Sequence, residues 1–115
     1  MREYQLMQSV LDQSLRRVRE KRAARVKSLH LVMGEISELN HASLLEYWHR
    51  LAKGTPAEGA QLHFRLAVAE VQCMACFRKY HPANGIIHCP YCGSFGAKIL
   101  SGEEFRVEEI ELEYD

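Results

Sequence analysis

The chain has 115 residues, of which 47% are hydrophobic and 26% charged, and its lysines and arginines (15) equal its aspartates and glutamates (15) in number. This composition is typical of a globular protein with one domain, or with a small domain that carries a smaller module. Domains that bind the nucleic-acid backbone are usually basic, so the balanced charge leads us to expect no nucleic-acid partner.

The first ten residues, MREYQLMQSV, contain charges at Arg2 and Glu3, and no apolar run in the chain approaches about 18 residues. We therefore expect no signal peptide and no membrane span. The expected location is cytoplasmic, where thiols stay reduced.

Two periodic segments open the chain. The first has helical spacing of its apolar residues and predicts an amphipathic helix, on Leu6, Val10, Leu11, Leu15 and Val18. Residues 26–33 change to alternation and predict a strand that ends at Gly34. In this strand Leu29 and Leu31 share one side, and His30 lies on the other.

The segments after Gly34 predict a second helix and two further strands. Asn40 is placed to cap a helix that ends before Gly54 and Pro56. Residues 61–68 alternate again, and residues 105–114 predict a last strand with a bulge near Glu108 and Glu109. The prediction is an α+β fold, with two helices packed on a three-stranded sheet and an inserted four-cysteine zinc ribbon.

The predicted domains follow from this order. Residues 1–69 plus 98–115 form the α+β domain, and residues 70–97 form the zinc-ribbon domain. The connections at 70–72 and 93–102 are the expected hinges, because the second contains three glycines.

The four cysteines form two close pairs, Cys73-Met-Ala-Cys76 and, twelve residues later, Cys89-Pro-Tyr-Cys92. Two residues between cysteines make a tight turn that aims both sulfurs at one point, and two such turns complete the tetrahedron of a structural zinc site. Gly93 follows the second pair, where the backbone often needs a conformation costly for other residues. Iron in a rubredoxin-like site is the main metal alternative, and two disulfides are a further one.

The residues between the pairs suggest a small core for this module, made of Phe77, Tyr80, Ile86 and Ile87. His81 and His88 lie close to the thiolates in sequence. Since four cysteines already suffice for zinc, we interpret both histidines as neighbours of the site rather than ligands.

Four motifs stand out along the chain: the G-E-I-S turn at 34–37, the G-T-x-A-E-G-A run at 54–60, the cysteine spacing, and the terminal G-x-E-x-x-V-x-E-I-E. Together they resemble the HypA/HybF family. The resemblance covers essentially the whole chain. It implies an accessory protein for the maturation of nickel–iron hydrogenases, with two helices against a three-stranded sheet and a projecting zinc domain.

The resemblance also implies partners and a nickel site. The partners are a nickel-binding GTPase of the same pathway and the immature large subunit of the nickel enzyme. In the family, transient nickel is held at the N-terminus by the terminal amine, a backbone nitrogen and an imidazole at the second position. The corresponding residues here are Met1, Arg2 and Glu3.

Arg2 stands where the family has histidine, and its guanidinium stays protonated and offers no lone pair to a metal. The nickel site is therefore not carried over intact. Three interpretations follow: docking with nickel held by a partner, nickel on other histidines, or a chain that no longer handles nickel.

The leading functional hypothesis is a non-catalytic accessory protein in nickel delivery and docking, with zinc in a structural role. The alternative is a related adaptor or complex subunit that has lost nickel binding and acts by docking. A nucleic-acid-binding zinc ribbon and an iron electron carrier are the other classes considered.

Overall fold

A computed structural model of the chain describes residues 2–82 and 88–115. Met1, Ile86 and Ile87, to which the sequence assigned roles, lie outside these residues. The elements in chain order are α1 (Arg2–Lys21), β1 (Arg25–Gly34), α2 (His41–Ala52), β2 (Gln61–Ala67), β3 (Glu70–Cys73), β4 (Lys79–Tyr80), β5 (Ala97–Ser101) and β6 (Phe105–Glu113).

The chain divides into two compact units. Unit 1 comprises Met1–Leu31, Leu39–Phe64 and Val107–Asp115, and unit 2 comprises Val32–Glu38 and Arg65–Arg106. The domain boundaries expected from the sequence, at 69/70 and 97/98, stay a prediction.

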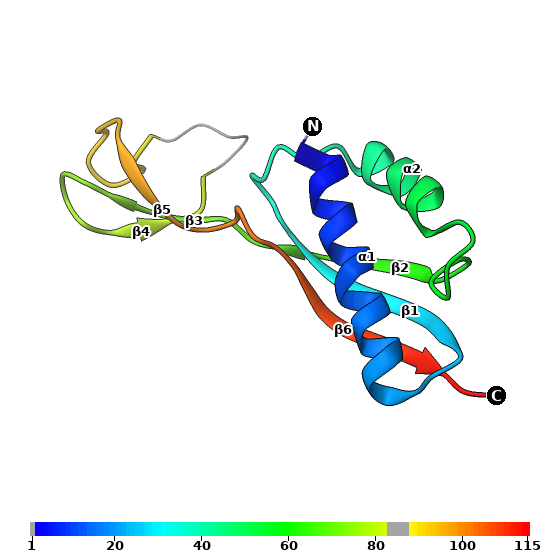
Figure 1. Cartoon of the computed structure of the whole chain (residues 1–115). Coiled ribbons are helices and arrows are strands. Elements are labelled where there is room, and N and C mark those ends of the chain that lie inside the picture. The colour runs from blue at the N-terminus through cyan, green and yellow to red at the C-terminus, as the bar shows by residue number, and fades with distance from the viewer. Residues whose placement is uncertain (1, 83–87) are drawn as a thin grey trace. The chain divides into compact units, whose positions relative to one another are not determined.

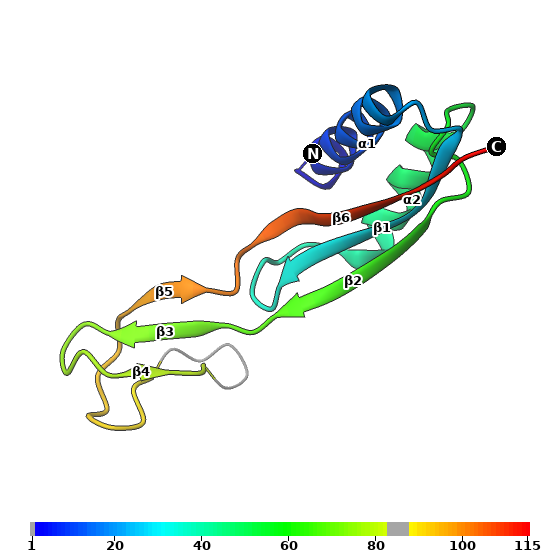
Figure 2. The same cartoon turned by 90° about the horizontal axis from the view of Figure 1, so that it is seen from below.

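The main sheet has the strand order β2-β1-β6, and α1 and α2 pack against each other on one of its faces (Figures 1 and 2). The core between helices and sheet contains fully buried side chains from three elements, Met7, Val10, Leu29, Leu31 and Leu44. This arrangement confirms the predicted α+β fold with two helices on a three-stranded sheet. No helix in the described part of the chain has the length and apolar character to cross a membrane.

Helix α2 begins where the sequence placed its cap. The side chain of Asn40 accepts a hydrogen bond from the Ser43 N–H at 3.0 Å, which satisfies one of the free donors of the first turn. The helix ends at Ala52, and Gly54 follows with a φ of 78°. The predicted start and stop of this helix are confirmed.

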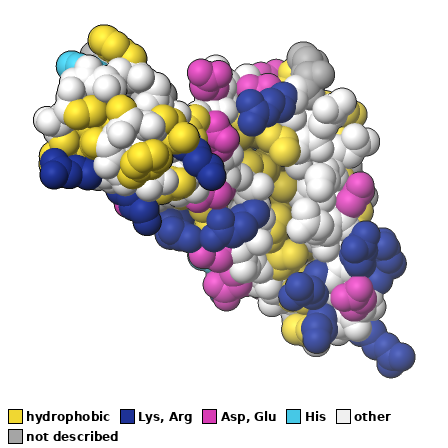
Figure 3. Space-filling view, turned by 90° about the vertical axis from the view of Figure 1, so that its left-hand side faces the viewer, with side chains coloured by type: hydrophobic (Ala, Val, Ile, Leu, Met, Phe, Trp, Pro, Cys, Tyr) yellow, Lys and Arg dark blue, Asp and Glu magenta, His cyan; other side chains and the backbone are white. Residues whose placement is uncertain are grey.

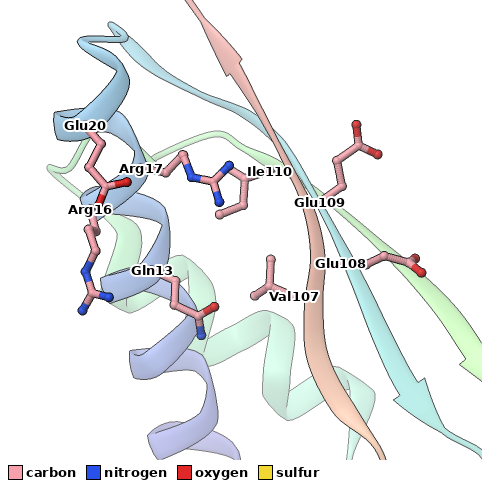
Figure 4. A pocket seen from close by; sticks show the side chains of 8 residues that line it. All are labelled: Gln13, Arg16, Arg17, Glu20, Val107, Glu108, Glu109 and Ile110. Carbon is pink, nitrogen blue, oxygen red and sulfur yellow. The ribbon is translucent and has the colours of Figure 1, made fainter.

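Strand β6 interrupts its alternation near two glutamates. Figure 4 shows the side chains of Val107 and Ile110 on the side of α1, while Glu108 and Glu109 both point away. Two apolar residues of opposite parity therefore share one face, which is the phase change that the sequence pattern predicted.

Unit 2 contains a second sheet, with the order β4-β3-β5. Val71 pairs with Ile99, and Cys73 with Ala97, in antiparallel register. The expected hinges at 70–72 and 93–102 are therefore wrong in part, because Glu70–Cys73 and Ala97–Ser101 are paired strands. Paired residues of β3 and β5 are more than 20 positions apart in sequence, so no local pattern reveals this pairing.

Candidate metal centre

The four cysteine sulfurs meet at one point of unit 2. All lie within 4.8 Å of one another, and the Cys73–Cys92 and Cys76–Cys89 sulfur pairs are each 3.6 Å apart. A tetrahedral ion with metal–sulfur bonds of about 2.3 Å requires sulfurs about 3.8 Å apart. The geometry of the cluster therefore fits a tetrahedral ion such as zinc.

Both cysteine turns have the same backbone construction. The Phe77 N–H donates to the Cys73 carbonyl at 2.9 Å, and the Gly93 N–H donates to the Cys89 carbonyl at 3.0 Å. The residue after each pair has a left-handed backbone, with φ of 63° at Phe77 and 80° at Gly93. The conformation expected of Gly93 is confirmed, and the same one is imposed on a phenylalanine.

Backbone N–H groups inside the turns point at the sulfurs. Ala75 and Cys76 lie 3.3 and 3.4 Å from the Cys73 sulfur, and Tyr91 lies 3.4 Å from the Cys89 sulfur. Such donors favour a charged sulfur over a neutral one. Hydrogen bonds from Cys76 and Ala75 accordingly lower the pKa of Cys73.

The cysteines hold their protons unequally. Hydrogen bonds from the Ser94 hydroxyl and N–H lower the pKa of Cys92 to about 6. At Cys76 the Arg78 N–H lowers the pKa, but desolvation and the nearby Cys89 thiol outweigh it and raise the pKa to about 11. A metal that binds here at neutral pH must therefore displace protons, as it does in thiolate sites generally.

The module's core differs in part from the prediction. Val71, Cys73, Tyr80 and Cys89 are buried together, and desolvation, followed by the nearby cysteine charges, raises the pKa of Tyr80. Phe77 was expected in this core, but it is 62% exposed. Its place in the turn gives it a left-handed backbone, with a φ of 63°, which composition alone does not reveal.

The two histidines near the cysteine pairs contact other groups in the structure. His81 Nε2 lies 2.8 Å from Glu35 Oε1, and His88 Nε2 lies 2.9 Å from the Gly93 carbonyl oxygen. His88 also stacks on Phe95, with ring centroids 4.8 Å apart. Their interpretation as neighbours of the site, rather than ligands, stays a prediction.

Glu35 is a residue whose structural role sequence reasoning missed. Besides His81, its carboxylate accepts the Ala69 N–H at 2.8 Å, and these bonds, Ala69 first, lower the pKa of Glu35. Glu35 belongs to the G-E-I-S turn that the sequence singles out, but its hydrogen-bond partners, Ala69 and His81, are 34 and 46 residues away in sequence. This carboxylate ties the turn after β1 to both ends of the segment that carries the first cysteine pair.

The residues of the expected nickel site have structural roles of their own. Helix α1 begins at the exposed Arg2, and the Glu3 carboxylate accepts the Asn40 N–H at 3.3 Å. Its own backbone N–H and that of Asn40 lower the pKa of Glu3. Met1 lies outside the described residues, so the three-residue nickel site stays a prediction.

A cavity of about 420 Å³ lies between α1 and β6 (Figure 4). Arg16, Arg17 and Glu20 line it from the helix, and Val107 and Ile110 from the strand. The described residues that line it include charges of both signs but no histidine or cysteine.

Comparison with known proteins gives a consistent result. The sequence profile of the family described as "Hydrogenase/urease nickel incorporation, metallochaperone, hypA" matches residues 1–112. Hydrogenase maturation factor HypA of Geobacter sp. (strain M21) is 35% identical, with 98% of this chain and all of the relative covered. The factor of the same name from Caldanaerobacter subterraneus subsp. tengcongensis is 31% identical, with the same coverage.

Solved structures show the same fold. The solution structure of the nickel metallochaperone HypA from Helicobacter pylori has a TM-score of 0.69 at 19% identity, and 98% of each chain is covered. A second solution structure of a HypA protein has a TM-score of 0.74, with 98% of this chain and 97% of the other covered. The chain belongs to the HypA family of hydrogenase maturation factors and nickel metallochaperones, with an arginine at its second position.

Proposed function

We propose that this chain delivers nickel during maturation of a nickel–iron hydrogenase and docks on the enzyme precursor. The observation that carries the proposal is the family match over residues 1–112, together with the four-cysteine cluster. Its partners in this proposal are a nickel-binding GTPase and the immature large subunit. The chain itself acts without catalysing a reaction.

The ion at the cysteine cluster is zinc in this proposal. Four sulfurs 3.6 to 4.8 Å apart fill a tetrahedral shell and leave no position for water or substrate. Zinc would therefore be structural, held by Cys73, Cys76, Cys89 and Cys92. Nickel is the cargo, bound only transiently.

Exposed apolar side chains on unit 2 support docking. Among the described residues the exposed large hydrophobic side chains of unit 2 are Leu66, Val68, Met74, Phe77, Tyr91, Phe95, Ile99 and Leu100. The only others in the described chain are Tyr4 and Tyr114. Figure 3 shows hydrophobic side chains gathered on one face of unit 2, with Lys and Arg side chains beside them. An apolar surface of this kind is typical of a protein–protein contact.

Delivery is tested in a host that lacks its own family member. The parent chain is expected to restore hydrogenase activity and the nickel content of the purified large subunit, relative to an empty vector. A chain that restores neither, although it is folded and metal-loaded, would contradict the proposal. Capture of the GTPase or the immature large subunit by the tagged chain tests docking in the same cells.

Arg2 favours a second candidate, the adaptor that docks but no longer binds nickel. A calorimetric titration with Ni²⁺ separates the two, on metal-loaded chain that begins at Met1, beside Arg2→His. Binding by both proteins supports delivery with ligands other than residue 2. Binding by the Arg2→His variant alone supports the adaptor.

A further inference from the structure

The main sheet carries two histidines side by side on neighbouring strands, His30 on β1 and His63 on β2. Their imidazole rings are stacked, with centroids 4.7 Å apart and an interplanar angle of 15°. Successive side chains of a strand point to opposite faces, so His30 points away from the face of the fully buried Leu29 and Leu31. Because the ring of His63 stacks on that of His30, the pair lies on the face of the sheet opposite Leu29 and Leu31.

A carboxylate from the third strand completes this group. Glu111 Oε1 on β6 lies 2.7 Å from His30 Nε2 and accepts the Ser28 hydroxyl at 2.7 Å. The hydrogen bond of His30, followed by that of Ser28, lowers the pKa of Glu111. The carboxylate is thus ionised at neutral pH, and 41% of its side chain is exposed.

Two imidazoles and one carboxylate are ligands that Ni²⁺, Cu²⁺ and Zn²⁺ accept. When one ion binds a nitrogen and an oxygen at about 2.0–2.2 Å each, those atoms lie about 2.9–3.5 Å apart. His30 Nε2 and Glu111 Oε1 are already at 2.7 Å. Exchanging their shared proton for an ion requires only a small separation of the two atoms.

His63 must rotate to join them. Within the described residues, three or more ligand atoms already lie within 4.8 Å of one another only at the four cysteines. His63 is exposed, and its ring rests against His30. The proposed site therefore requires a rotation about the His63 side-chain torsions that brings a ring nitrogen toward the other two ligands.

We propose that His30, His63 and Glu111 form a second metal site, for Ni²⁺, on the face of the sheet opposite the helices. The inference rests on the proposed function, because nickel delivery makes Ni²⁺ the relevant ion. Three protein ligands leave positions for water on a six-coordinate ion, which suits a cargo that must be released. The site uses no atom of residue 2, so Arg2 does not block it.

The test is a calorimetric titration of the full metal-loaded chain with nickel chloride. The parent is expected to bind a single Ni²⁺, and His63→Ala to weaken this binding about tenfold or more, since even partners outside the ligand set contribute 10–100-fold. Glu111→Gln should weaken it as well. His49→Ala is the matched control, because His49 is an exposed histidine on α2, and it should bind as the parent does.

Nuclear magnetic resonance locates the ion independently of affinity. Six-coordinate Ni²⁺ is paramagnetic, so the ring signals of His30 and His63 should broaden at the lowest nickel concentrations. Broadening that begins at His41, His49, His81 or the first residues would overturn the proposal. Nickel–thiolate absorption during the titration, which reports binding at the cysteines, would also contradict it.

The two proposals fail in different ways. If the parent does not bind Ni²⁺, or if His63→Ala and Glu111→Gln bind it as the parent does, the histidine site is wrong. Hydrogenase maturation by the parent would then still support delivery or docking. If the parent fails to restore maturation, the proposed function is wrong, whatever the titration shows.

Discussion

At the scale of single residues, the two cysteine turns differ in the residue that follows each pair. Phe77 and Gly93 occupy equivalent positions after the two pairs, with φ of 63° and 80°. A left-handed backbone costs a residue with a Cβ about 1–2 kcal/mol, whereas glycine adopts it freely. The first turn therefore stores strain that the second avoids.

Two single substitutions test this difference in backbone strain. Gly93→Ala should lower the free energy of unfolding by about 1 kcal/mol, because a Cβ there meets nothing closer than His88 at 3.8 Å and only the backbone is strained. Phe77→Gly should leave the free energy of unfolding within about 1 kcal/mol of the parent value, or raise it. Glycine relieves the backbone strain in the folded protein, but it also gives the unfolded chain more freedom, which opposes this gain. Urea unfolding of the metal-loaded proteins measures both. A large loss from Phe77→Gly would show that the exposed ring packs after all.

Glu35 gives stability a defined dependence on pH. Its pKa is held below the ordinary value of 4.5, chiefly by the Ala69 N–H and then by His81. A depressed pKa stabilises the fold above the unfolded value, and that stability is lost as pH falls through the folded value. In urea unfolding, Glu35→Gln should therefore have a lower free energy of unfolding than the parent at pH 7. This difference in free energy should become smaller below pH 4.5.

The comparison of parent and variant at each pH removes the effect of acid on the cysteine site, which both share. Glu38→Gln changes an exposed glutamate of the same turn and serves as the control. Equal unfolding of the parent and Glu35→Gln at pH 7 would show that the carboxylate bonds contribute nothing measurable.

At the scale of elements, two glycines in unit 2 allow the end of β1 to approach the chain between β5 and β6. The Ile36 N–H donates to the Gly102 carbonyl at 2.8 Å, and the Gly34 N–H donates to the Glu104 carbonyl at 2.7 Å. A Cβ on Gly34 would lie 2.0 Å from the Gly102 carbonyl oxygen. One on Gly102 would lie 2.7 Å from the Ala69 Cα.

Gly34→Ala should therefore destabilise the protein by about 2 kcal/mol or more, because backbone must move to admit the methyl group. Gly59→Ala is the control, since Gly59 also has a positive φ of 82° but has nothing within 4 Å of an added Cβ. It should cost only the strain of about 1 kcal/mol. If urea unfolding shows equal losses of unfolding free energy in both variants, the backbone around residue 34 accommodates the methyl group without cost.

At the scale of the molecule, we expect the sheet β4-β3-β5 to depend on the metal proposed for the four cysteines. Among the described residues, the buried core cluster around the cysteines consists of Val71, Cys73, Tyr80 and Cys89, so two of these four are themselves ligands in the proposed site. Metal binding to such small modules contributes about 10–16 kcal/mol. The apolar core of unit 1 contains no cysteine.

Removal of the metal with a chelator should thus unfold the β4-β3-β5 sheet and leave the helices in place. Amide signals of residues 70–80 and 97–101 should collapse to unfolded positions, while those of α1 and α2 stay dispersed. Helical circular dichroism should change little. Loss of the helical signal on chelation would mean that the helices depend on the metal as well.

Local chemistry in the sequence determined a large part of this protein. Apolar spacing located α1, α2 and the three long strands, because helix and strand periods are set by backbone geometry. The Asn40 cap, the left-handed Gly93 and the phase change before Ile110 are local effects, and each was readable from neighbouring residues. The sequence motifs by themselves also indicate the family of the chain.

Only the tertiary structure decided which distant residues meet. Three sets of contacts join segments 24 to 81 residues apart: the pairing of β3 with β5, the bonds of Glu35 to Ala69 and His81, and the group His30, His63 and Glu111. Contacts of this kind depend on how elements pack, and single-sequence periodicity reports the face of each element but not the partner that it meets.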